Sequence, residues 1–119
     1  MEKREIGNLG EDIASAFLQK KGYAVIRRNF SCRLGEIDII AEKDAFLCFV
    51  EVKLRKDAHH GEAREFVTRS KQKKIILAAK YYLSKNETEL QPRFDVVEVY
   101  MPDGPGGKAY VRLIENAFE

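Results

Sequence analysis

The chain has 119 residues, of which 45% are hydrophobic and 34% are charged, and its formal net charge is +2. This length suits a single domain over residues 1–119, because a chain of this size can bury about two-thirds of its unfolded surface in a core without disulfides. There is no run of about 18 apolar residues and no signal peptide, so we expect no membrane partner and a cytoplasmic location.

In the first part of the chain, apolar residues recur at helical spacing and predict an amphipathic helix over residues 5–21, ended by Gly22. Three strands are expected next, over residues 23–30, 36–41 and 46–54. A connection of hairpin length, residues 42–45, joins the last two. The third strand is apolar on both faces at its start, which is typical of a central strand covered on both sides. Cys48 lies in this run and is expected to be a small buried hydrophobic residue.

The second part of the chain predicts another helix and two more strands. A polar loop over residues 55–63 is followed by a long helix over about residues 64–84. The core face of this helix is expected to contain Ile75, Ile76, Ala79, Tyr82 and Leu83. Pro92 marks a loop before a strand over residues 93–100, and an edge strand is expected over residues 109–114. The order α-β-β-β-α-β-β predicts an α/β fold, with a central mixed sheet of about five strands flanked by helices.

Charges are distributed unevenly along the chain. Residues 53–85 contain ten Lys/Arg and three acidic residues, whereas the rest of the chain contains eleven and sixteen. This asymmetry predicts a basic surface that faces a polyanion, unless the run is simply a solvated, lysine-rich helix. The residues expected to contact phosphates, with little sequence preference, are Arg55, Arg64, Arg69, Lys71, Lys73 and Lys74.

A chemically unusual group of side chains precedes this basic run. In the strand over residues 46–54, a side-chain period of two places Glu51 and Lys53 on one face. Charged residues at the end of an apolar central strand are costly unless they are paired, hydrated or bound to a ligand. In the preceding strand, Asp38 falls where hairpin pairing brings it beside Glu51. Two such carboxylates repel each other unless a cation neutralises them.

A hard divalent cation such as Mg²⁺ suits this carboxylate pair, because it binds one or two carboxylates together with waters and phosphate oxygens. Lys53 would then hold a phosphate oxygen or stabilise a hydroxide nucleophile, and the metal would lower the pKa of a water. These groups predict hydrolysis of a phosphodiester. The alternative is a structural salt bridge at the strand end, between Lys53 and either Asp38 or Glu51.

Two segments of the sequence, GEIDIIA over residues 35–41 and FVEVK over residues 49–53, resemble the PD-(D/E)XK nuclease superfamily. The motif is loose here, since Ile37 stands where its name has proline. Nearly the whole chain is similar to the YraN-like family of small bacterial proteins, relatives of archaeal Holliday-junction resolvases. The resemblance implies a restriction-endonuclease-like fold, dependence on Mg²⁺ or Mn²⁺, and a branched, flapped or damaged DNA substrate. It is also compatible with a homodimer.

The resemblance assigns roles to four residues of the motif. The metal-binding aspartate of the superfamily corresponds to Asp38, its second acidic residue to Glu51 and its lysine to Lys53. The backbone carbonyl of Val52 would be a further metal ligand. This assignment predicts a divalent-metal-dependent endonuclease. The alternative is a nucleic-acid-binding protein on a nuclease fold that is catalytically silent or needs a partner.

The resemblance implies two further catalytic positions, Glu11 on the first helix and Gln72 on the helix after the motif. An exposed helix carboxylate remains the alternative for Glu11, and a hydrogen bond to nearby backbone remains the alternative for Gln72. His59 and His60 are expected in a loop near the site, where they contact substrate. A zinc site is not expected, because adjacent histidines in an extended chain point apart.

Overall fold

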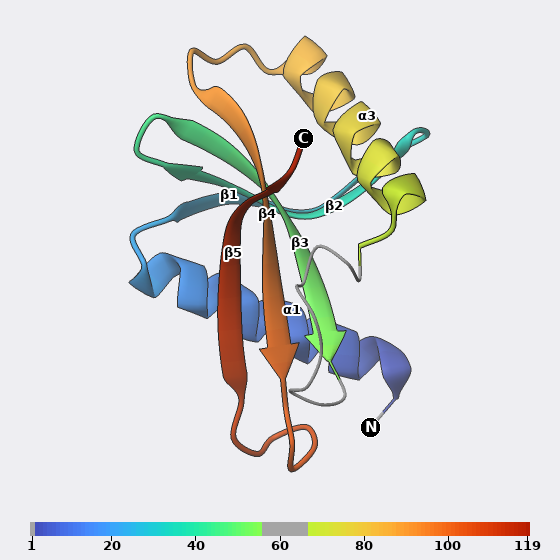
Figure 1. Cartoon of the computed structure of the whole chain (residues 1–119), viewed down its shortest axis with the longest axis vertical. Coiled ribbons are helices and arrows are strands. Elements are labelled where there is room, and N and C mark those ends of the chain that lie inside the picture. Colours follow the sequence, from blue (N-terminus) through green and yellow to red (C-terminus); the bar gives the residue numbers. More distant parts are fainter. Residues whose placement is uncertain (1, 56–66) are drawn as a thin grey trace.

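The computed structural model describes residues 2–55 and 67–119, and this part of the chain forms two helices and five strands (Figure 1). They follow one another in the order α-β-β-β-α-β-β, which confirms the predicted α/β fold. The elements are α1 Lys3–Lys20, β1 Ala24–Cys32, β2 Gly35–Lys43, β3 Phe46–Arg55, α3 Arg69–Lys85, β4 Gln91–Tyr100 and β5 Tyr110–Phe118.

The five strands form one sheet in the order β1-β2-β3-β4-β5. β3 is therefore the central strand and β5 an edge strand, as predicted. β3 and β4 run parallel, while the other neighbours are antiparallel, so the sheet is mixed. A parallel pair needs a long crossover connection, and α3 lies within that connection.

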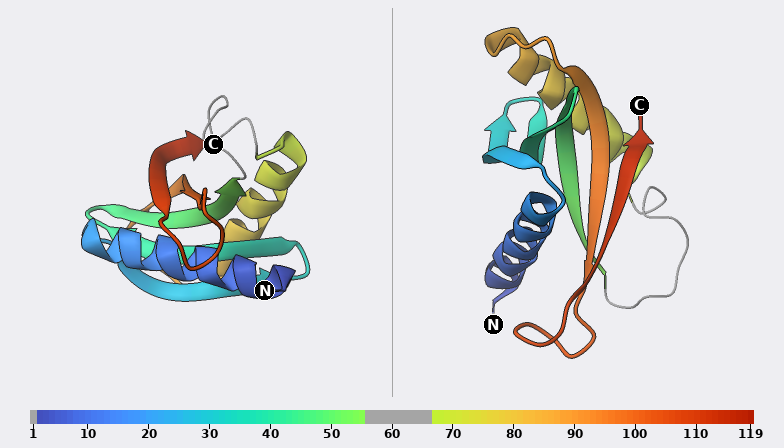
Figure 2. Two further views of the ribbon diagram at one scale, coloured as in Figure 1. Left: turned by 90° about the horizontal axis from the view of Figure 1, so that it is seen from below. Right: turned by 90° about the vertical axis from the view of Figure 1, so that its left-hand side faces the viewer.

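The two helices pack on opposite faces of the sheet (Figure 2). Side chains of β3 alternate between the two cores. Leu47 and Phe49 lie on the α3 side, whereas Cys48 and Val50 lie on the α1 side. All four are at most 2% exposed, which confirms that β3 is covered on both faces. Neither of the described helices is long and apolar enough to cross a membrane.

The second helix begins later than the sequence suggests. We expected a start near residue 64, but α3 starts at Arg69, after the N-cap residue Thr68. The Thr68 side chain accepts a hydrogen bond from the backbone N–H of Lys71 at 3.1 Å, which satisfies one of the unpaired donors of the first turn. The predicted core face is confirmed, since its members are buried in the same core or pack against it: Ile75, Ile76, Ala79, Tyr82 and Leu83.

The last two strands are longer than predicted. Pro92 lies inside β4 and not in the loop before it. Proline is tolerated there because β5 pairs with β4 only from Phe94 onward, which leaves the start of β4 with a free edge. β5 continues past residue 114 to Phe118 through Asn116, which has a φ of 51°. The backbone N–H of Asn116 donates to Asp95 at 2.9 Å and thereby holds the extension in place.

Gly35 opens β2 at a close approach to α3. A Cβ atom at this position would lie 2.8 Å from the carbonyl oxygen of Lys74 and 3.2 Å from its carbonyl carbon. Because these are backbone atoms of a helix, they cannot rotate away. We expect Gly35→Ala to lower the free energy of unfolding by about 1–3 kcal/mol, as measured by chemical denaturation.

Gly7→Ala is the matched control for this prediction. Gly7 lies in α1, and nothing lies within 4 Å of a Cβ atom built on it. Alanine in a helix interior is expected to stabilise by roughly 0.5–1 kcal/mol relative to glycine. If Gly35→Ala and Gly7→Ala changed the free energy of unfolding in the same direction, the close approach of Gly35 to α3 would not explain the result.

Candidate metal centre

Asp38 lies where β2 separates from β3. The two strands are paired as far as Ile39 and Val50. One step further, Asp38 Oδ2 accepts a hydrogen bond from the backbone N–H of Val52 at 2.8 Å, in place of a bond between the two backbones. The N–H and C=O groups of one residue in an extended strand point to the same neighbour. The carbonyl of Val52 therefore faces the side on which β2 leaves β3.

Glu51 lies next to Asp38. Its side chain is 12% exposed and forms a hydrogen bond with the Asp38 carboxylate. Burial, the charge of Asp38 and this hydrogen bond raise the pKa of Glu51 to about 8, against smaller opposing effects of Lys71 and Lys53. The two carboxylates thus lie side by side, at a point where β2 departs from regular alternation, because Ile37 packs in the core on the α3 side and Ile39 in the core on the α1 side. Without a cation, they retain a proton between them at neutral pH.

Two lysines approach this carboxylate pair. Lys53 follows Glu51 by two residues, and its charge lowers the pKa of Glu51. Among the residues that the structure describes, Lys53 forms no ion pair with a carboxylate, so the structural salt bridge to Asp38 or Glu51 is absent. Lys71, in the first turn of α3, does form one, with its Nζ 3.8 Å from Glu51 Oε2. A lysine predicted for phosphate contact therefore also reaches the carboxylate pair.

Glu11 approaches the pair from α1. It is 8% exposed, so the alternative of an exposed helix carboxylate is wrong. Burial raises the pKa of Glu11, hydrogen bonding and the charge of Arg28 partly oppose this, and the nearby charge of Asp38 raises it further. Arg28 Nε donates to Glu11 Oε1 at 3.2 Å, and Arg28 Nη2 donates to Asp12 Oδ1 at 2.7 Å.

Arg28 and Asn29 are site residues that sequence reasoning missed. Asn29 lies at an irregular point of β1, opposite Asp38, where the register passes from Arg28 paired with Ile39 to Phe30 paired with Ile37. Its φ of 54° is a left-handed conformation that asparagine tolerates better than most residues. The Asn29 side chain lies close enough to Glu11 to lower the pKa of its carboxyl slightly, against the larger effect of burial. The sequence signal for this feature is the polar run Arg-Arg-Asn inside a predicted strand.

Gln72 lies one residue after Lys71 in the first turns of α3 and is half-buried. Its Nε2 donates a hydrogen bond to the backbone carbonyl of Val67 at 2.8 Å. This is the backbone contact that the sequence leaves open as an alternative. A catalytic role for the Gln72 amide stays a prediction.

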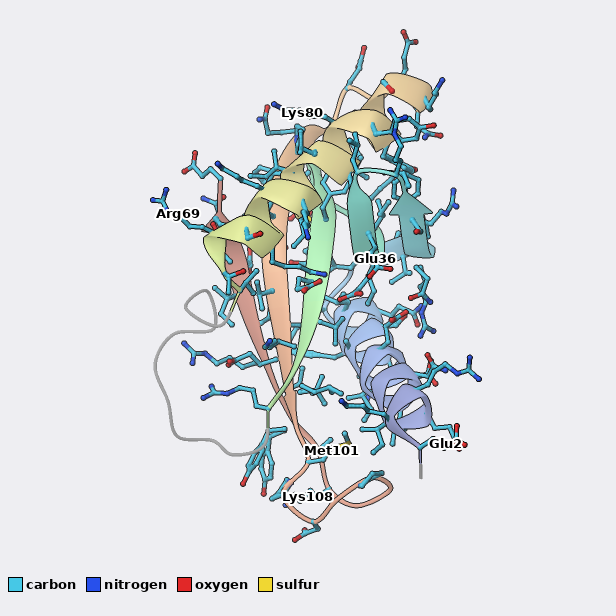
Figure 3. The ribbon with its side chains drawn as sticks, turned by 90° about the vertical axis from the view of Figure 1, so that its right-hand side faces the viewer. Glu2, Glu36, Arg69, Lys80, Met101 and Lys108 are labelled. Carbon is cyan, nitrogen blue, oxygen red and sulfur yellow. The ribbon has the colours of Figure 1, made fainter. Side chains whose placement is uncertain are left out.

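Three of the predicted phosphate-contacting residues, Arg69, Lys73 and Lys74, are exposed on α3. The 17 residues of this helix include six Lys/Arg and no acidic residue. Figure 3 shows its basic side chains from Arg69 at one end to Lys80 near the other. Most of the basic residues of this helix therefore lie in its first two turns, beginning beside the carboxylate pair.

Arg55 is placed differently from the other predicted phosphate contacts. Its side chain is 10% exposed, and Nη1 lies 2.9 Å from Oε2 of Glu98 on β4. Glu98 is itself 4% exposed, so the fold already balances the charge of Arg55. The sequence could not indicate this, because the partner lies on another strand. Arg64, His59 and His60 lie outside the described residues.

The donor atoms at this site suit Mg²⁺ or Mn²⁺. Two carboxylates and a backbone carbonyl are oxygen ligands, which hard cations prefer, and such ions complete their shell with water and phosphate oxygens. Across residues 2–55 and 67–119, no group of three or more His, Cys, Asp or Glu side chains is arranged to hold a metal ion, so an ion at this carboxylate pair would depend on water and phosphate oxygens for the rest of its shell. The raised pKa of Glu51 gives the pair a physical reason to take up a cation.

These features define a small α/β protein with an oxygen-rich acidic site at the centre of a mixed sheet. The chain belongs to the family described as "Uncharacterised protein family UPF0102", which matches residues 10–99. This confirms the predicted YraN-like family. The matched region contains Glu11, Asp38, Glu51 and Lys53.

Relatives in this family are similar over most of their length. A UPF0102 protein of Caldicellulosiruptor saccharolyticus is 44% identical over 119 residues, which cover 99% of this chain and 100% of the relative. One from Symbiobacterium thermophilum is 46% identical over 116 residues, or 97% of each chain. One from Clostridium perfringens is 50% identical over 97 residues, which cover 81% of this chain and 80% of the relative. These similarities establish the family of the chain but not its activity.

Proposed function

We propose that this protein is a divalent-metal-dependent endonuclease that hydrolyses phosphodiester bonds in DNA, with branched or flapped DNA as its substrate. The observation that carries the proposal is the contact between Asp38 and Glu51 at the point where β2 leaves β3, with Lys53 two residues further. A buried carboxylate such as Glu51, whose pKa is raised by burial and by a neighbouring carboxylate, is costly, and groups of this kind concentrate at functional sites.

Each residue of the cluster has a distinct chemical part. Asp38, Glu51 and the carbonyl of Val52 would hold Mg²⁺ or Mn²⁺. The bound metal would supply positive charge at the scissile phosphate and lower the pKa of a water molecule. Lys53 would place its ammonium group against a phosphate oxygen and stabilise the negative charge that develops there.

The two helices supply further groups. Glu11 on α1 and Gln72 on α3 would orient water and substrate. Arg69 and Lys71 lie in the first turn of α3, where positive side chains oppose the helix dipole. A phosphate bound at this end would offset that cost, which supports DNA as the polyanion.

A cleavage assay on junction, flap and linear DNAs tests the proposal. We expect Mg²⁺ or Mn²⁺ to stimulate cleavage of the branched or flapped DNAs, and EDTA to abolish it. Lys53→Met keeps the length of the side chain but removes its charge, so it should abolish cleavage. Lys80→Met, on the exposed part of α3, is the control and should retain it. Failure of a folded chain to cleave any of these DNAs with either metal would overturn the proposal.

A DNA-binding protein that is catalytically silent, or that needs a partner, is the second candidate. It is favoured by the contacts of Arg28, which engages Glu11 and Asp12 and so neutralises part of the acidic group. Such a protein would bind DNA in a salt-sensitive manner without cleaving it. Binding and cleavage measured on the same samples at increasing salt separate the two candidates. The cytoplasmic location and the homodimer also stay predictions.

A further inference from the structure

The face of the sheet that carries Glu51 continues beyond the end of α3. α3 packs mainly against β2 and β1, and neither described helix covers this face at the far ends of β3, β4 and β5 (Figures 1 and 3). Two rows of neighbouring residues lie there. The rows are Lys53, Glu98 and Arg112, and then Arg55, Tyr100 and Tyr110. We call these six residues, together with Lys108, the tyrosine strip.

A pair of tyrosines forms the outer end of the tyrosine strip. The ring centroids of Tyr100 and Tyr110 are 6.1 Å apart, with 31° between the ring planes. Tyr110 is 51% exposed, the most exposed of the large hydrophobic residues that the structure describes. Aromatic rings gain most from burial of their faces. The exposed ring of Tyr110 is therefore available to a flat ligand.

Cations surround this tyrosine pair. Lys108 Nζ lies 5.5 Å from the centroid of the Tyr110 ring, and Figure 3 shows Lys108 at the end of the sheet farthest from α3. The Arg112 side chain is 56% exposed, with Nη1 3.7 Å from Glu98 Oε1. Glu98 is the one carboxylate of the tyrosine strip. The cations that can face a ligand are the exposed Lys108 and Arg112, with Lys53 at the inner end, whereas Arg55 is paired with Glu98.

We propose that the tyrosine strip binds a single-stranded stretch of nucleic acid, with bases stacked on Tyr110 and Tyr100 and with phosphates held by the neighbouring cations. Stacked aromatic rings beside a positively charged track are the chemistry with which proteins hold single strands. A duplex hides the faces of its bases, so it cannot use the rings. Because every base has a stackable face, we expect little sequence preference.

The position of the tyrosine strip indicates which class of DNA the protein prefers, and this part of the inference rests on the proposed function. Arg55 follows Glu51 by four residues along β3, and Tyr100 is its neighbour on β4. At about 3.3 Å per residue, the tyrosines begin about 13 Å from Glu51 along the sheet. A few nucleotides span this distance. The preferred DNA would then carry a single-stranded arm next to the scissile bond, as a flap does.

The test uses fluorescence anisotropy with a labelled oligothymidylate of about 12 nucleotides, a typical single-strand site size, in EDTA so that cleavage plays no part. We expect Tyr110→Ala to weaken its binding by about 5- to 150-fold, the range for loss of one stacked base. Tyr110→Phe should bind like the unaltered chain. Tyr110→Trp should also bind and, since the chain has no tryptophan, it should report binding by quenching of its fluorescence.

Tyr81→Ala is the matched control. Tyr81 is 43% exposed and has Lys85 Nζ 5.8 Å from its ring centroid, but it lies on α3 away from the tyrosine strip. Tyr81→Ala should leave oligothymidylate binding unchanged. As a second control, Tyr110→Ala should leave the binding of a blunt duplex of the same length unchanged. Thermal unfolding of each variant separates a loss of binding from a loss of folding.

The inference is overturned if folded Tyr110→Ala binds oligothymidylate normally, or if it loses duplex binding to the same extent. Cleavage of a flap DNA by the native chain and by Asp38→Asn, measured beside their oligothymidylate binding, separates this inference from the proposed function. If the native chain does not cleave DNA but binding still depends on Tyr110, the single-strand site stands and the nuclease proposal fails. If the native chain cleaves DNA and binding does not depend on Tyr110, the nuclease proposal stands and the single-strand site fails.

Discussion

Replacement of Asp38 by asparagine is expected to reduce metal-stimulated DNA cleavage by at least about 100-fold, because groups that merely support a metal ligand are already worth about 10- to 100-fold. The amide oxygen of asparagine can still accept the hydrogen bond from the backbone N–H of Val52, which is 2.8 Å long in the native chain. The variant therefore keeps the separation of β2 from β3 and loses a charge. Binding of DNA in EDTA should stay within about twofold, since phosphate contacts come from lysine and arginine.

Single-turnover cleavage of a flap DNA, with Mg²⁺ and separately with Mn²⁺, measures this effect. Glu36→Gln is the matched control, because Glu36 is an exposed acidic residue two positions before Asp38 in β2 (Figure 3). It also removes one negative charge, but away from the carboxylate pair. Cleavage by Asp38→Asn at the native rate would remove Asp38 from the metal centre.

Replacement of Glu51 by glutamine is expected to stabilise the metal-free protein at high pH. The pKa of Glu51 is raised from its ordinary 4.5 to about 8, first by burial and then by Asp38. The folded state therefore holds the proton more tightly than the unfolded state does. The free energy of unfolding falls as the pH rises between these two values and stays low above them. Glutamine cannot ionise, and its amide N–H can still donate to the Asp38 carboxylate.

The gain from Glu51→Gln should accordingly be small near about pH 5 and reach about 2–4 kcal/mol near about pH 9, since one unit of pKa shift corresponds to about 1.4 kcal/mol. Urea denaturation in EDTA at the two pH values measures it. Glu36→Gln again serves as the control, and its effect should not change in this way with pH. Destabilisation by Glu51→Gln at both pH values would show that the carboxylate is needed for folding and is not a strained group.

Divalent metal should reverse the loss of stability that the native chain shows at high pH. Excess Mg²⁺ or Mn²⁺ should raise the melting temperature of the native chain most at high pH, where the carboxylate pair is ionised, and should do so far less in Glu51→Gln. The melting temperature reports metal binding without DNA. Equal stabilisation of the native chain and the variant would place the metal elsewhere.

The strand patterns in the sequence determined much of the site. A side-chain period of two is a local property of an extended chain, so the relation of Glu51 to Lys53 follows as soon as the strand is recognised. The hairpin between β2 and β3 brings Asp38 close to the end of β3, although β2 departs from regular alternation at this residue. The order of the elements and the central position of β3 follow from hydrophobic patterns of the same kind.

Other features were decided by the tertiary structure, because they join residues that are far apart in the sequence. Arg28 engages Glu11 across the contact between β1 and α1, and Lys71 reaches Glu51 from the first turn of α3, which begins at Arg69. A charge count along the chain cannot distinguish such cations from solvated ones, since it does not contain their distances to carboxylates on other elements.

Arg55 and Tyr110 show two ways in which the sequence pattern and the tertiary structure can differ. Arg55 belongs to the basic run in the sequence, yet Glu98 on the next strand neutralises it inside the fold. Tyr110 has no distinctive sequence context, yet the pairing of β4 with β5 places it against Tyr100 on a part of the sheet that neither described helix covers. The sequence by itself determined which residues share a strand face, because that depends on local backbone geometry. The tertiary structure decided which charges remain available to a ligand, because that depends on what each strand and helix packs against.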